Sequence, residues 1–117
     1  MKRALIIAAF LAIAAMGIAV AWSLWDPGVQ VTIVNVGAKP LRSVVVHVTG
    51  NSYPVGDIEP GASKTVAVHA KGESSIELEH DGGKRLDVDC YFEKGYGGKI
   101  TAEVTGEKVV SVKSDVR

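Results

Sequence analysis

Four carboxylates on two neighbouring predicted strands have the spacing most suggestive of chemistry. Glu77 and Glu79 share one face of the first strand, and Asp87 and Asp89 share one face of the next. Residues 81–85 between them are typical of a hairpin turn, which would bring the four carboxylates together. Such a group of hard oxygen ligands could bind Ca²⁺ or receive a basic partner. The alternative is a solvated sheet face whose charges are balanced by nearby basic side chains.

The three histidines are the other candidate metal ligands. His47 and His69 fall on the polar side of their predicted strands, whereas His80 has the opposite parity and stands beside a turn. A Zn or Cu site needs three or four ligands, and the spacing indicates no third ligand for His47 and His69. We therefore expect solvated surface histidines, with a metal-binding module as the alternative.

The single cysteine, Cys90, does not have the setting of a nucleophile. It alternates in phase with Val88 and Phe92, which predicts an inward-facing, inert thiol. A catalytic cysteine would need an exposed position and a neighbouring histidine. We find no catalytic constellation and no cofactor motif in the sequence, so we expect a protein that is not an enzyme.

A glycine-rich stretch at 95–98, followed by Lys99, lacks the spacing and the strand-to-helix setting of a phosphate-binding loop. Strand-like residues flank it on both sides, so we expect a mobile hairpin that presents Tyr96. An exposed tyrosine on a loop tip is a common anchor in protein interfaces. Tyr53, which precedes Pro54, is the second candidate for contact with a partner protein.

The elements that must position these residues are short strands, because apolar and polar residues alternate with a period of two after residue 28. The alternating segments are 29–33, 44–48, 65–70, 76–79, 86–92, 100–105 and 110–113. Glycine and proline gather between them, as is typical of turns. The pattern predicts an all-β fold, an antiparallel β-sandwich of seven to eight strands spanning 29–117, with a small barrel as the alternative.

Turn motifs in the first half of this region resemble a known class of module. The stretch Asn35-Val36-Gly37 follows the first predicted strand, and Ile58-Glu59-Pro60-Gly61 precedes a later one. Over residues 29–70 the chain resembles immunoglobulin-like adhesion or accessory modules of bacterial and archaeal exported proteins. The resemblance implies an immunoglobulin-like sandwich and carries no catalytic residues, since turn chemistry is shared by many unrelated folds.

The N-terminal segment, residues 1–25, has the pattern of a membrane anchor. Lys2 and Arg3 precede an uncharged apolar run at 4–25, which as a helix would cross a hydrocarbon core of about 30 Å. The basic pair predicts a cytoplasmic start, and Trp22 and Trp25 would lie at the far interface. Residues 26–28 then form a short tether to the domain.

The competing interpretation is a cleavable signal peptide. Ala19-Val20-Ala21 matches the small-x-small cleavage pattern, with cutting after Ala21 and secretion of the remainder. Both interpretations place residues 29–117 outside the cytoplasm, in the periplasm or on the cell surface.

The balance of charged residues limits the kinds of partner that this chain is expected to bind. The chain has 13 basic and 13 acidic residues, so it lacks the positive balance of a nucleic-acid-binding protein. We expect no cofactor and no nucleic-acid partner. The sequence predicts a membrane-tethered accessory module that binds another protein of the cell envelope. The alternative is a released periplasmic module that binds a ligand or a metal ion (Ca, Zn or Cu).

Overall fold

The fold is described from a computed structural model, which places residues 28–117. This part of the chain is all-β and contains no helix, as the alternation predicts. Its eight strands are β1 (Val29–Asn35), β2 (Leu41–Val48), β3 (Asn51–Ile58), β4 (Ser63–Val68), β5 (Ser74–His80), β6 (Lys84–Phe92), β7 (Gly98–Val104) and β8 (Val109–Val116).

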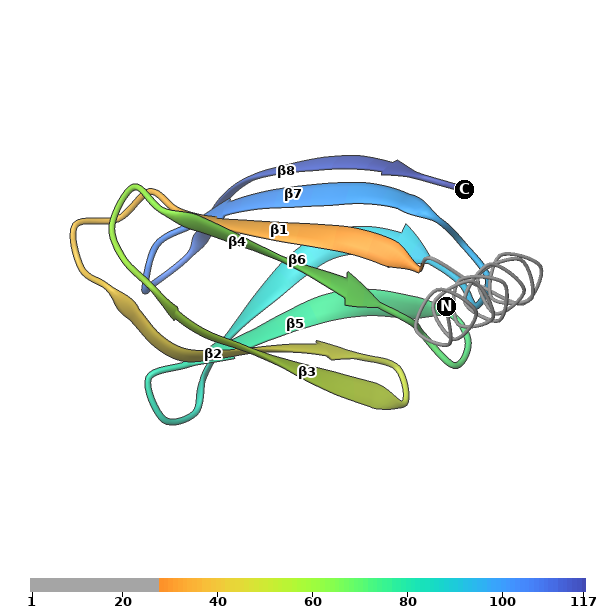
Figure 1. The fold of residues 1–117 in the computed structure, drawn as a ribbon, viewed down its shortest axis with the longest axis horizontal. Coiled ribbons are helices and arrows are strands. Elements are labelled where there is room, and N and C mark those ends of the chain that lie inside the picture. The colour runs from red at the N-terminus through yellow and green to blue at the C-terminus, as the bar shows by residue number, and fades with distance from the viewer. Residues whose placement is uncertain (1–27) are drawn as a thin grey trace, which may run out of the picture.

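The strands form two four-stranded sheets that face each other around one core (Figure 1). One sheet has the order β4-β1-β7-β8, and the other has the order β3-β2-β5-β6. The edge strand β3 contacts β4 of the facing sheet, and β6 contacts β8 in the same way. Alternate side chains point inward, and the largest of those that are fully buried are Phe92, Ile33, Leu41, Ile58, Ile76, Leu78 and Ile100.

The expectation of a wholly antiparallel sandwich is wrong at one pair of strands. β1 pairs with β7 in parallel along its whole length, from Val29 opposite Gly98 to Asn35 opposite Val104. A parallel pair needs a long connection, and here the connection contains the five strands β2 to β6. Local alternation cannot reveal this pairing, because it depends on where a distant strand returns to the sheet.

The strand β3 is absent from the predicted segments, none of which lies between residues 48 and 65. Its residues alternate poorly, and Pro54 lies in its middle. The structure makes β3 an edge strand, where a residue without an N–H group is tolerated. The register of β2 against β3 also shifts beside Val44, which breaks the pattern further.

The carboxylate of Asp57 stabilises the irregular start of β2. Ser43 has a positive φ of 50°, and its amide donates to Asp57 Oδ1 over 2.9 Å. Arg42 donates to Asp57 and to Glu59, with N···O distances of 3.1 and 2.9 Å. The backbone hydrogen bond from Ser43, followed by the one from Arg42, lowers the pKa of Asp57.

We therefore expect Asp57→Asn to destabilise the protein at neutral pH and to matter less in acid. A lowered folded-state pKa gives stability that is present above the unfolded pKa and is lost as the pH falls through the folded one. Thermal unfolding of both proteins from neutral pH to about pH 2 measures this, since ordinary aspartate titrates near pH 4. Asp115→Asn, at the exposed end of β8, is the matched control for removing one negative charge. A difference in melting temperature between wild type and Asp57→Asn that stays constant across this pH range would contradict the prediction.

Candidate functional site

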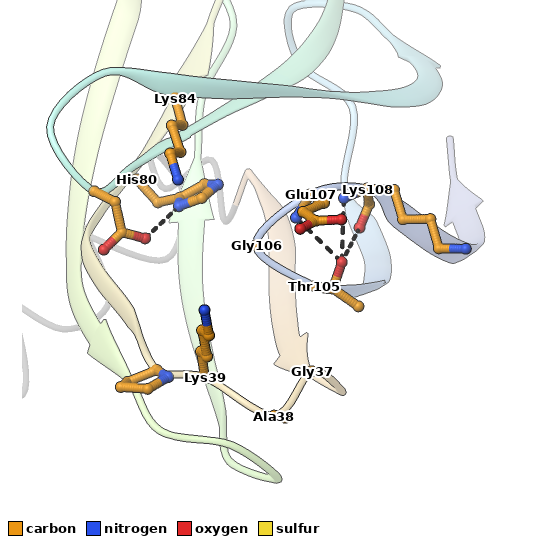
Figure 2. Close-up of a pocket in the computed structure, with 11 residues that line it drawn as sticks. Gly37, Ala38, Lys39, His80, Lys84, Thr105, Gly106, Glu107 and Lys108 are labelled. Carbon is orange, nitrogen blue, oxygen red and sulfur yellow. Dashed lines mark hydrogen bonds and ion pairs between the residues drawn. The ribbon is translucent and has the colours of Figure 1, made fainter.

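A pocket of about 570 Å³ opens at one end of the two sheets (Figure 2). Three connections that are distant in sequence line it: the β1–β2 loop, the β5–β6 turn and the β7–β8 turn. Gly28 stands at the opposite end, because β1 runs from Val29 toward the pocket (Figure 1). The lining residues are Gly37, Ala38, Lys39, Pro40, His80, Asp81, Lys84, Thr105, Gly106, Glu107 and Lys108.

His80 is the most unusual of these residues, because its ring is only 2% exposed. Its Nδ1 lies 2.5 Å from Asp81 Oδ2, and since a carboxylate cannot donate, Nδ1 carries the proton. The other nitrogen, Nε2, is buried and has no hydrogen-bond partner among residues 28–117. The expectation of a solvated surface histidine is therefore wrong for His80. His80 has the same parity in β5 as Ile76 and Leu78, so its side chain points inward. Its position at the end of β5 places it beside the pocket.

Asp81 is held in place for this contact. It adopts a positive φ of 50°, which aspartate tolerates better than most residues, and its amide donates to the carbonyl of Arg42 over 2.8 Å. The hydrogen bond from His80 is the main cause that lowers the pKa of the Asp81 carboxyl. The pair is thus a buried imidazole oriented by a half-exposed carboxylate.

Basic residues from two connections point into the pocket. Figure 2 shows the amino groups of Lys39 and Lys84 directed to the side where His80 lies, whereas the amino group of Lys108 points away. Thr105 Oγ accepts hydrogen bonds from the amides of Glu107 and Lys108, both at 3.2 Å, and so fixes the β7–β8 turn. The lining of the pocket thus combines the amino groups of Lys39 and Lys84 and the ring of His80 with the carboxylates of Asp81 and Glu107.

Asn35 organises the backbone at the pocket end of the sheets. It is fully buried, and its amide group donates to the carbonyls of Lys39 and Ile58, over 2.8 and 3.0 Å. Its Oδ1 accepts from the amide of Gly37 over 3.0 Å. Asn35 therefore ties the β1–β2 loop to the end of β3 and fixes the backbone from which Lys39 projects.

The predicted acidic cluster is only partly assembled. Glu77 stands opposite Asp87 in the ladder, but Glu79 stands opposite Arg85. Arg85 bonds both Glu77 and Glu79, and the hydrogen bond to Glu77 is the main cause that raises the pKa of Arg85. Asp89 is exposed further along β6. Within residues 28–117 no group of three or more His, Cys, Asp or Glu side chains is placed to hold a metal ion.

His47 and His69 contact different parts of the molecule. The His47 ring lies 2.7 Å from Ser52 Oγ and 3.1 Å from Glu79 Oε1, on the outer face of its sheet. The His69 ring instead lies against Gly28, where a Cβ atom would meet it at 2.8 Å. The ring of His47 is thus held by β3 and β5, and the ring of His69 lies beside the start of β1.

The two candidate contact tyrosines are both half-buried and pack against the core. Tyr96 lies in the connection from β6 to β7, which crosses between the sheets, so the expected hairpin at 95–98 is wrong. The hydroxyl of Tyr53 accepts from the amide of His69 over 2.9 Å and lies 3.2 Å from its carbonyl. Tyr53 therefore links β3 to the residue that follows β4.

Cys90 is half-buried, in phase with the inward residues Val88 and Phe92 as the alternation predicts. Burial raises the pKa of its thiol, which keeps the thiol protonated and poorly nucleophilic.

The proposed membrane residues Lys2, Arg3, Trp22 and Trp25, and the tether at 26–27, lie outside the described residues. Across 28–117, no helix has the length and apolar character needed to span a bilayer.

Comparison with known proteins adds one structural likeness. No family model matches the chain, and no curated protein matches it. A protein from Eubacterium rectale, solved by NMR, is similar in structure, with a TM-score of 0.44 and 10% sequence identity. The likeness covers 72% of this chain and 87% of that one.

The sequence did not single out the pocket, because its lining comes from three separate turns. Two signals for it were present. His80 has inward parity at the end of a strand, and Lys39, Lys84 and Lys108 all stand in predicted turns or beside them.

Proposed function

We propose that this chain is a non-enzymatic accessory module of the cell envelope that binds another protein through its pocket end. In this proposal residues 4–25 form a transmembrane anchor, Lys2 and Arg3 stay in the cytoplasm, and the sheets lie outside it, in the periplasm or on the cell surface. Trp22 and Trp25 would then lie at the outer membrane–water interface.

The observation that carries the proposal is that the start of β1 and the pocket lie at opposite ends of the two sheets. The apolar run leads through a tether of three residues, 26–28, into the start of β1, and the pocket lies where β1 finishes. An anchored domain would thus hold its membrane-proximal end at Gly28 and present the pocket outward. The turn motifs at Asn35 and Ile58 further favour an immunoglobulin-like class of module, whose loops commonly provide binding surfaces.

Site-specific crosslinking in native membranes tests which end binds. A photoreactive residue at Lys108, in the turn beside the pocket, is compared with the same residue at Lys71, between β4 and β5 at the other end. Both positions are exposed, so they are a matched pair. We expect a discrete protein adduct from position 108 and a much weaker one from position 71. Equal yields from both positions, or no adduct from either, would refute binding through the pocket end.

The anchor is tested separately by the mass of the mature protein. An intact N-terminus starting at Met1 in the membrane fraction supports the anchor. A mature chain starting at Trp22 in the soluble fraction would instead support the released periplasmic form.

A further inference from the structure

We propose that the end pocket binds a small oxyanion, the carboxylate or phosphate group of a ligand, through Nε2 of His80 and the amino groups of Lys39 and Lys84. The inference names the chemistry that the pocket recognises. It rests on the proposed function only in taking this end of the molecule as the binding end.

The first argument is the unsatisfied nitrogen of His80. A buried polar atom without a partner is costly and uncommon in folded proteins, and a bound ion or water molecule is one explanation for it. Asp81 accepts the Nδ1 proton over 2.5 Å and so orients the ring, whose Nε2 lies on the side away from Asp81 (Figure 2). When the imidazole takes up a second proton, Asp81 stabilises the cation, and Nε2–H becomes a donor suited to an anion.

The second argument is the charge that faces the ring from each connection. The β1–β2 loop supplies Lys39, and the β5–β6 turn supplies Asp81 and Lys84. The β7–β8 turn supplies the carboxylate of Glu107 and also Lys108, whose amino group points away (Figure 2). Asp81 is already engaged by His80, and the amino groups of Lys39 and Lys84 are directed to the side where the ring lies (Figure 2). They favour an oxyanion over a divalent cation, which they would repel.

The third argument is that the pocket is held in shape before any ligand arrives. Asn35 fixes the carbonyl of Lys39, Thr105 fixes the β7–β8 turn, and the Arg42 carbonyl fixes Asp81. Preorganised donors lose little entropy on binding, which favours recognition of a small ligand. A volume of about 570 Å³ falls in the range of small-molecule sites.

Ring NMR of the full chain, labelled with ¹⁵N-histidine in detergent micelles, tests the inference. The protein is titrated with inorganic phosphate, with succinate, and with sodium chloride at matched ionic strength. We expect the His80 ring signals to shift and saturate with phosphate, succinate or both, but not with chloride. His47 and His69 line no part of the pocket, so their rings serve as internal controls. Which of the two anions binds tells whether the ligand group is a phosphate or a carboxylate.

Proton uptake at Nε2 of His80 should accompany binding, because that nitrogen must carry a proton in order to donate to an oxyanion.

Substitutions in the pocket test whether its residues bind the anion. The double variant Lys39→Gln/Lys84→Gln should weaken binding roughly three- to tenfold, since each partly solvated charge contributes modestly. Lys71→Gln, at the other end, is the matched control and should change nothing. His80→Gln should abolish saturable binding, and the lysine variants decide the question if that protein does not fold.

Three results would each overturn the inference: no saturable shift of His80, the same shift with chloride, or unchanged affinity in the double lysine variant. The titration uses no partner protein and no membrane. Its failure is therefore distinct from failure of the crosslinking experiment.

Discussion

Replacing Asn35 with alanine is expected to lower the free energy of unfolding by about 3 kcal/mol, because buried groups left without partners each cost roughly 1–3 kcal/mol. The side chain makes three hydrogen bonds, and alanine removes all three at once. The carbonyl of Ile58 stays buried after the change, whereas the groups of Gly37 and Lys39 lie nearer to water and regain part of the loss.

Urea unfolding of the full chain in micelles, followed by near-ultraviolet circular dichroism, measures this loss. Val36→Ala is the matched control, because Val36 directly follows Asn35 at the start of the β1–β2 loop and is exposed. Its cost should stay within about 0.5 kcal/mol, as for most surface substitutions. Equal costs for the two variants would show that Asn35 does not organise this end.

The same variant links stability to the pocket. Without Asn35 the carbonyl of Lys39 is no longer fixed, so the Lys39 amino group is less well placed. Where Asn35→Ala remains folded, we therefore expect weaker oxyanion binding as well. The asparagine acts as a positioning residue and does not itself line the pocket.

The sequence predicts the core of this fold well, because each sheet buries one face. In β1, the residues Val29, Val31 and Ile33 are at most 1% exposed, and Gln30 and Thr32 between them are not buried. The same alternation turned Cys90 and His80 inward. A period of two is a property of each strand alone, so it can be identified without knowing the partners of that strand.

Strand pairing is the part that the sequence does not reveal. The parallel contact between β1 and β7 joins segments about 70 residues apart, and no local pattern encodes it. The pocket was missed for the same reason, since its three turns meet only once both sheets are assembled. The strand β3 was missed because Pro54 and the bulge beside Val44 interrupt its pattern.

The acidic residues show how register decides a site. Parity correctly placed Glu77 and Glu79 on one face, and Asp87 on the same face of the next strand. The turn after His80 then sets the register, which puts Arg85 opposite Glu79. A basic residue thus stands where a cluster of carboxylates was expected, and it compensates their charge.

The largest loss of stability is expected from Phe92→Ala, at about 3–5 kcal/mol, because truncating a buried aromatic removes its contacts and leaves a cavity. Phe92 is 1% exposed and is the largest fully buried side chain among residues 28–117. A domain of this size is usually stable by only about 5–15 kcal/mol, so the variant should lose a large share of the total. Urea unfolding measures the loss under the conditions used for Asn35→Ala.

Tyr91→Ala is the matched control, since it truncates the neighbouring aromatic on the opposite face of β6. Tyr91 is 54% exposed, and its hydroxyl donates to Glu93 over 2.7 Å. Its loss should cost no more than about 1 kcal/mol, the usual value of one exposed hydrogen bond with its packing. Because a slip of one residue in the register of β6 would exchange the two faces, the pair also tests the strand itself. A larger cost for Tyr91→Ala than for Phe92→Ala would mean that β6 presents its other face to the core.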